Sequence, residues 1–208
     1  MSELLLSPAE ARVLAALVEK SITTPNYYPM TVNGLMAAAN QKNGRNPVMT
    51  LTEGQVGGAL NTLSEHRLVS RDDTLSRVPK WRHQFHHQLL IKTPTLAVLV
   101  ALMLRGPQTL AELRTNSAAL HGPDTVEGVR EALALLADRA QPLVCEMARV
   151  PGQAATRWAQ LLCGEDAIPE PTVSATPAAP RDGGRLEARI EALETRLAEL
   201  ERKLSDLL

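Results

Sequence analysis

The chain contains one pattern of residues twice, and this repeat limits its fold more than any other feature. The first copy runs Val56-x-x-Ala59-Leu60-x-x-Leu63-x-Glu65-His66, continues with Leu68-Val69 and ends at Lys80-Trp81. The second copy runs Val129-x-x-Ala132-Leu133-x-x-Leu136-x-Asp138-Arg139, continues with Leu143-Val144 and ends at Arg157-Trp158. Each copy predicts a helix with one apolar stripe, a short strand, a loop and a returning strand. That order is the last part of a winged helix, so the repeat predicts two winged helices in tandem.

Capping residues predict where the helices of each copy begin. Three helix starts in the first copy are marked by Ser7 with Glu10, by Thr31, and by Thr52 with Gln55. The corresponding starts in the second copy are marked by Thr93-Pro94, by Thr109 with Glu112, and by Asp124 with Glu127. Strands are expected at 68–71 and 78–85, and at 143–149 and 156–162. The predicted fold class is mainly α with small β wings (α+β), with winged-helix domains at residues 1–90 and 91–162.

The C-terminal residues 163–208 have a different composition. Residues 163–184 contain four prolines among Ala, Ser, Thr and Gly, which predicts a flexible linker without a core. Residues 185–208 place apolar side chains at alternating spacings of four and three: Leu186, Ile190, Leu193, Leu197, Leu200, Leu204 and Leu207. This heptad pattern predicts a coiled-coil helix.

The charges beside this seam indicate how two such helices would pair. Position g carries Arg189, Arg196 and Lys203, and position e carries Glu187, Glu194 and Glu201. A parallel pair brings opposite charges together, whereas an antiparallel pair opposes like charges. We therefore expect a parallel homo-oligomer, in the first place a homodimer. A trimer, and a single amphipathic helix that packs on its own chain, remain open.

Composition excludes several classes of protein. The net charge of −1 over 208 residues argues against a protein that coats nucleic acid. The longest apolar run, residues 96–104, is shorter than the roughly 18 residues of a membrane span, and the N-terminus has no signal-peptide pattern. Cys145 and Cys163 show no disulfide framework. We expect a cytoplasmic protein without membrane association.

Several short stretches resemble a known family. The segments Asn33-Gly34, Asn40-Gln41-Lys42, Arg45 and Pro47-Val48-Met49 are similar to the signature stretch of the YceH-like family of bacterial proteins. Leu6 with Glu10 to Val13, the segment Leu104-Arg105-Gly106-x-Gln108-Thr109 and the coiled tail are similar as well. The resemblance covers nearly the whole chain and implies two winged helices. It implies no catalytic residues and no particular biochemical function.

The third helix of the first copy is the candidate reader of DNA, because helix-turn-helix folds place this helix in the major groove. Helical geometry directs Gly54, Gly58, Asn61 and Glu65 outward. Asn pairs with adenine and a carboxylate accepts from cytosine, but this face has no Lys or Arg. Glycines 54, 57 and 58 either allow close approach of a phosphate or another helix, or are merely tolerated in a thin helix.

Cationic residues are predicted to flank this helix. Lys42 and Arg45 precede it, and Arg71, Arg77, Lys80 and Arg82 belong to the predicted wing. Such positions suit phosphate contacts that orient a protein on a duplex. An ordinary solvated surface explains the same residues, and two aspartates at the wing tip count against binding.

The third helix of the second copy has the opposite character. Its predicted outward residues are Glu127, Glu131, Ala134 and Asp138. Three carboxylates repel phosphate, so we expect this helix to contact protein or to be purely structural.

No pattern in the chain indicates catalysis. The run His83-x-x-His86-His87 lacks the additional ligands of a zinc site. Neither a catalytic triad nor a paired-carboxylate site is evident, so we expect no enzymatic activity, no metal and no cofactor. Two hypotheses remain: a regulatory, homo-oligomeric protein that binds duplex DNA, and a scaffold whose winged helices bind a protein partner instead.

Overall fold

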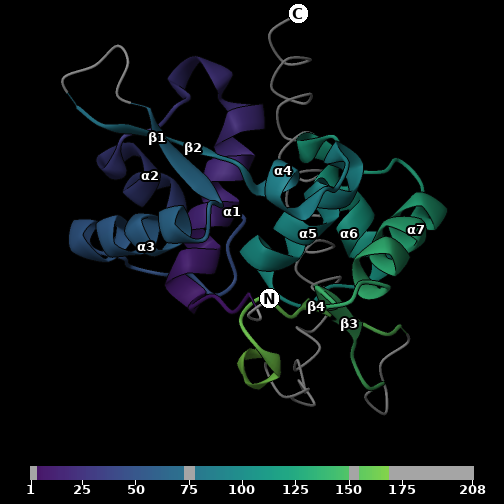
Figure 1. The fold of residues 1–208 in the computed structure, drawn as a ribbon. Coiled ribbons are helices and arrows are strands. Elements are labelled where there is room, and N and C mark those ends of the chain that lie inside the picture. The colour runs from purple at the N-terminus through teal and green to yellow at the C-terminus, as the bar shows by residue number, and fades with distance from the viewer. Residues whose placement is uncertain (1–3, 73–77, 150–154, 169–208) are drawn as a thin grey trace, which may run out of the picture. The chain divides into compact units, whose positions relative to one another are not determined.

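A computed structural model of the chain describes residues 4–72, 78–149 and 155–168 (Figure 1). The fold is mainly helical with two small two-stranded sheets, which confirms the predicted α+β class. The described residues all belong to one compact unit. The predicted linker from residue 169 onward, the heptad residues from Leu186 to Leu207, and Arg77 lie outside the described residues.

The N-terminal half (residues 4–90) contains five helical segments and one hairpin. They are α1 (Pro8–Thr23), η1 (Pro25–Tyr27), α2 (Val32–Ala39), α3 (Glu53–Glu65), β1 (Val69–Asp72), β2 (Lys80–His83) and α4 (Phe85–Leu89). The C-terminal half (residues 91–168) contains α5 (Thr93–Arg105), α6 (Leu110–Ser117), η2 (Ala118–Leu120), α7 (Val126–Ala137), β3 (Val144–Glu146), β4 (Trp158–Gln160) and η3 (Glu165–Ala167).

Most helix starts are where the capping residues predict them. Ser7, Thr52 and Thr109 each form a complete capping box with the acid or amide three residues later. Thr31 caps α2 by accepting from the Gly34 amide at 3.2 Å. The prediction for α7 was wrong by one residue. Thr125, not Asp124, is the N-cap, and its hydroxyl accepts from the Gly128 amide at 3.1 Å.

The predicted returning strand of the first copy was too long. β2 ends at His83, and the short helix α4 begins at Phe85. Phe85 and Leu89 lie four residues apart, so one helical turn directs both into the core, where Phe85 is fully buried. β3 and β4 are also shorter than predicted, whereas β1 has the predicted length and is shifted by one residue.

The two halves share an arrangement beyond the repeated pattern itself. Met30 forms an antiparallel bridge with Trp81, and Gln108 forms the same bridge with Trp158. Both bridges are reciprocal pairs of main-chain hydrogen bonds, 3.0 and 2.8 Å long in each half. Each bridging residue is followed directly by the N-cap of the next helix. Each half is therefore ordered as helix, bridging residue, helix, helix and hairpin.

Helices α1 and α5 form the centre of the described structure (Figure 1). Helices α2 and α3 pack on α1, helices α6 and α7 pack on α5, and α1 packs on α5. Residues 11–18 of α1 and 95–104 of α5 are all buried, which requires helices that are covered on every side. One continuous aliphatic core results, and the domain boundary predicted at residue 90 falls between α4 and α5 within this compact unit.

A buried arginine connects the two halves. Arg12 of α1 is 2% exposed and donates to three main-chain carbonyls: Pro47 at 2.8 Å, Leu104 at 3.4 Å and Ala39 at 3.5 Å. These carbonyls belong to the loop after α2, to the last turn of α5 and to the end of α2. One guanidinium therefore joins four segments of the chain.

We predict that replacing Arg12 with Met lowers the free energy of unfolding by about 3 kcal/mol, because buried carbonyls lose charged donors. Urea unfolding followed by circular dichroism measures this change. The matched control is Arg130→Met, which removes an exposed cation that pairs with Glu127 on the same helix and should change stability by less than about 0.5 kcal/mol. Equal losses in the two variants would contradict the role assigned to Arg12.

Candidate nucleic-acid interface

The exposed face of α3 is the one the sequence predicts. Val56, Leu60 and Leu63 are fully buried, whereas positions 54, 58, 61 and 65 are exposed. Asn61 therefore presents its amide to solvent. The helix carries Glu53 and Glu65 and has no basic residue between them, so its own surface supplies no positive charge for a phosphate.

Packing within the described structure does not require the glycines of α3. A Cβ added at Gly54, Gly57 or Gly58 would have nothing within 4 Å. By contrast, a Cβ at Gly122 would lie 2.2 Å from the Ser117 hydroxyl. The α3 glycines thus reduce helix stability without a packing requirement in the part of the chain that is described. A partner that approaches the helix backbone closely, or simple tolerance, explains them.

We predict that Gly58→Ala raises the free energy of unfolding by about 0.5–1 kcal/mol, since Ala is the better helix former and the space is open. Chemical denaturation of the purified protein measures this. Gly122→Ala is the contrasting control and must destabilise, because its methyl group would overlap Ser117. A destabilised Gly58→Ala variant would show that the fold itself needs this glycine.

The predicted cations have very different surroundings. Arg45 is 6% exposed, and its two terminal nitrogens contact the two carboxylate oxygens of Glu19 at 3.0 and 2.5 Å. It also donates to the Ala38 carbonyl at 2.9 Å. The expectation that Arg45 contacts phosphate from a surface loop was wrong in this structure: its charge is used inside the protein.

The wing cations are partly engaged as well. Arg82 pairs with Asp72 at 2.6 Å across the hairpin, and Arg71 is exposed but already takes part in an interaction. Lys42 is exposed and Lys80 is half-buried, and neither forms an ion pair with a described residue. Of the predicted set, Lys42, Lys80 and Asn61 are thus the residues whose side chains are most available to a ligand.

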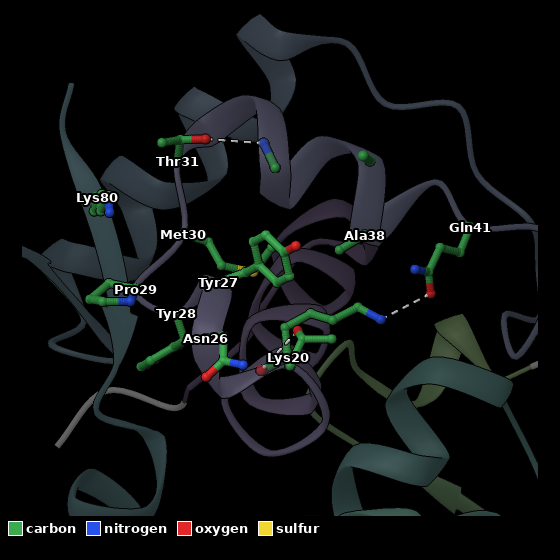
Figure 2. Close-up of a pocket in the computed structure, with 13 residues that line it drawn as sticks. Lys20, Asn26, Tyr27, Tyr28, Pro29, Met30, Thr31, Ala38, Gln41 and Lys80 are labelled. Carbon is green, nitrogen blue, oxygen red and sulfur yellow. Dashed lines mark hydrogen bonds between the residues drawn. The ribbon is translucent and has the colours of Figure 1, made fainter.

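Lys80 lines a hollow of about 500 Å³ between the end of α1, η1, α2 and β2 (Figure 2). Lys20 lines it from the last turn of α1, and Lys20 Nζ lies 3.3 Å from both Glu19 Oε2 and Gln41 Oε1. The polar residues around the hollow are Lys20, Thr24, Asn26, Tyr27, Tyr28, Thr31, Gln41 and Lys80. Tyr27 is 79% exposed.

The hollow exists because distant segments pair. The Met30–Trp81 bridge holds the N-cap Thr31 beside β2, so the start of α2 and Lys80 come together. The His83 amide donates to the Tyr28 hydroxyl at 2.7 Å, which ties the loop after η1 to the same strand. The sequence did not indicate Lys20, Asn26 or Gln41 as site residues. Its local signals were Tyr27 between two prolines and Gln41 within the Asn40-Gln41-Lys42 stretch, and neither indicates that these residues lie near Lys80.

His83 lies behind this hollow in a cluster with His86 and His87. The His83 Nε2 lies 3.1 Å from the Ser21 hydroxyl, and the His83 and His86 rings lie 5.3 Å apart. Burial, together with the neighbouring His86 and His87, lowers the pKa of His83 to about 4. Among the described residues, no group of three or more His, Cys, Asp or Glu is arranged to hold a metal.

The low pKa of His83 predicts a loss of stability in mild acid. In the unfolded chain the ring titrates near 6.5, so between that pH and about 4 the unfolded state binds a proton that the folded state does not. The free energy of unfolding should then fall by up to about 1.4 kcal/mol per pH unit as the pH decreases.

Urea unfolding at about pH 7, 6 and 5 measures this slope. His83→Gln should reduce this slope. Burial and the neighbouring His87 also lower the pKa of His86, so His86 contributes to the slope that remains. An equal slope in wild type and His83→Gln would assign the acid sensitivity to other groups.

The C-terminal half offers a less favourable surface. Glu127, Glu131, Ala134 and Asp138 are exposed on α7 as predicted. Arg157, which precedes Trp158 as Lys80 precedes Trp81, contacts Glu112 at 3.0 Å. The second copy therefore neutralises the cation that corresponds to Lys80.

Comparison with known proteins gives one consistent result. Residues 6–153 match the family described as "Protein of unknown function, DUF480". A UPF0502 protein of Geobacter sulfurreducens is 42% identical over 204 residues, covering 95% of this chain and 91% of the relative. A UPF0502 protein of Burkholderia ambifaria is 48% identical over 160 residues, covering 77% of this chain and 67% of the relative. In the described residues, no helix is long and apolar enough to span a membrane.

Proposed function

The chain belongs to the DUF480 family, and we propose that it is a non-enzymatic, regulatory DNA-binding protein of the cytoplasm, built from two winged helices and a C-terminal coiled coil. The YceH-like resemblance is consistent with this family and agrees with the same architecture. The N-terminal half is the DNA-binding part of the proposal, and the C-terminal half has a supporting role.

The order of elements supports a winged helix in each half. A bridging residue after the first helix, two further helices and an antiparallel hairpin follow one another in both halves. In such folds the third helix enters the major groove while neighbouring segments contact the backbone. Here the third helix is α3, and the hairpin β1–β2 is the wing.

The observation that carries the proposal is the hollow beside α2. Lys20 and Lys80 face it together with Asn26, Tyr27 and the start of α2. Two cations, neutral hydrogen-bonding groups and the positive end of a helix suit a phosphate of the DNA backbone. Lys42, exposed directly after Gln41, adds a second phosphate contact.

The face of α3 supplies the remaining contacts. Its glycines allow the groove wall to approach the helix backbone, and Asn61 can pair with an adenine edge. Since α3 has no cation of its own, affinity depends on Lys20, Lys42 and Lys80 around it. We expect one chain to bind DNA with modest affinity. We propose that a parallel coiled-coil dimer, formed through the heptad residues of 185–208, brings two N-terminal halves to one duplex and so raises the affinity.

One observation favours a second function. The outward face of α7 and its C-cap carry Glu127, Glu131 and Asp138 against the exposed Arg130, which pairs with Glu127. The outward face of α3 carries two glutamates and no basic residue. A scaffold that binds a basic protein segment through these helices fits this charge pattern. It would need no phosphate contact from Lys42 or Lys80.

Fluorescence anisotropy with a labelled random-sequence duplex, at low and raised salt, tests the DNA-binding proposal. Phosphate contacts predict affinity that falls steeply with salt. Lys42→Gln and Lys80→Gln should each weaken binding and reduce the slope of log K against log salt by about 1. Arg114→Gln, an exposed cation of α6, is the matched control and should change neither quantity.

The outcomes separate the two functions. Absence of binding at low salt, or binding that is equal in the wild type and both lysine variants, would reject the DNA interface described above. In that case the acidic residues predict that the wild-type protein binds a basic peptide. The double variant Glu127→Gln, Glu131→Gln should bind the same peptide more weakly.

A further inference from the structure

The hollow beside α2 is larger and more apolar than a single phosphate group requires. Its volume of about 500 Å³ falls within the range of roughly 300–1,000 Å³ that is usual for sites of small organic molecules. Tyr27, Pro29 and Ala37 line it together with the polar residues. Tyr27 and Ala37 are exposed and Pro29 is half-buried, so a ligand can reach their apolar surface. A phosphate group makes no favourable contact with such surface, whereas a larger and partly apolar group does.

Tyr27 presents its ring from a restrained loop. The ring is 79% exposed and, within the described part of the chain, stacks on no other aromatic ring. The neighbouring Tyr28 hydroxyl accepts from the His83 amide at 2.7 Å, and Pro25 and Pro29 restrict the backbone on either side. An exposed ring on a restrained loop suits stacking, because little conformational entropy is lost when a ligand binds.

Hydrogen-bonding groups and a cation lie around this ring (Figure 2). Asn26 and Gln41 are exposed, and their amides can bond to the edge of a base. Lys80 forms no ion pair with a described residue, so its charge is available to a phosphate. A stacking ring, partners for the edge of a base and a cation for the phosphate are the contacts by which proteins hold single-stranded nucleic acids.

An unpaired nucleotide can use all of these contacts, and a paired nucleotide cannot. Each base in a duplex is stacked between its neighbours, so Tyr27 can stack only on a base that has left the helix. We propose that the hollow binds one unpaired nucleotide of a DNA strand, with its base stacked on Tyr27 and its phosphate at Lys80. This inference rests on the proposed function and narrows the substrate to DNA that carries an unpaired base.

Fluorescence anisotropy with three labelled duplexes of one sequence tests the proposal. One duplex is continuous, the second has a bulged thymidine at its centre, and the third has an abasic residue in the same bulge. The two bulged duplexes have the same backbone and differ only in one base. Stacking predicts that the wild-type protein binds the thymidine bulge at least about fivefold more tightly than the abasic bulge.

The ratio of these two affinities is compared between variants. Tyr27→Ala should bring the two affinities close together, whereas Tyr27→Phe should preserve the difference, because the ring and not the hydroxyl stacks. Both changes are on the surface and spare the core. Leu135→Ala, at an exposed apolar position of α7, is the matched control and should keep the wild-type ratio.

Equal affinity of the wild type for the two bulges, no binding of either bulge, or a preference that survives in Tyr27→Ala would overturn the proposal. The continuous duplex is a separate readout for the proposed function. Salt-dependent binding of the continuous duplex with no preference between the bulges would retain the DNA interface and reject the nucleotide site. Binding of the thymidine bulge alone, with dependence on Tyr27, would reject the duplex interface and support the nucleotide site.

Discussion

The buried guanidinium of Arg12 is the interaction on which the rest of the fold depends. It donates to carbonyls at the end of α2, in the following loop and in the last turn of α5, and the Asn46 amide reaches the same Leu104 carbonyl at 2.9 Å. Three of the stretches that carry the family resemblance therefore meet at this point. The presence of Arg12 in this resemblance is explained first by the junction of the two halves, since a buried cation requires acceptors in fixed places.

The two halves are similar in backbone but differ in the charges that their third helices and hairpins expose. Both place a tryptophan of the returning strand against the residue before the second helix, which is a requirement of the fold. The cation before that tryptophan is available in one half, as Lys80, and paired with Glu112 in the other, as Arg157. The two halves thus share this packing while their surfaces differ, which is why only the N-terminal half is proposed to contact DNA.

Arg45 shows where sequence reasoning stops. Its place in a polar loop predicts a solvated cation, yet Glu19, 26 residues earlier, binds it inside the protein. Lys20 shows the converse, because its position in α1 gives no sign that it faces Lys80 across a hollow. In each case the partner is remote in sequence, and neither periodicity nor capping contains information on such pairs.

The sequence alone determined where most of the helices begin, which faces of α3 and α7 are exposed, and that one arrangement occurs twice. Those features depend on hydrogen bonds and apolar spacings within a few residues, so they are present in the order of residues itself. Tertiary structure alone decided which cations remain available, that α4 follows β2, and that the buried Arg12 joins the two halves. These depend on burial and on contacts between distant segments, because the surroundings of a charge are set only when the chain is packed.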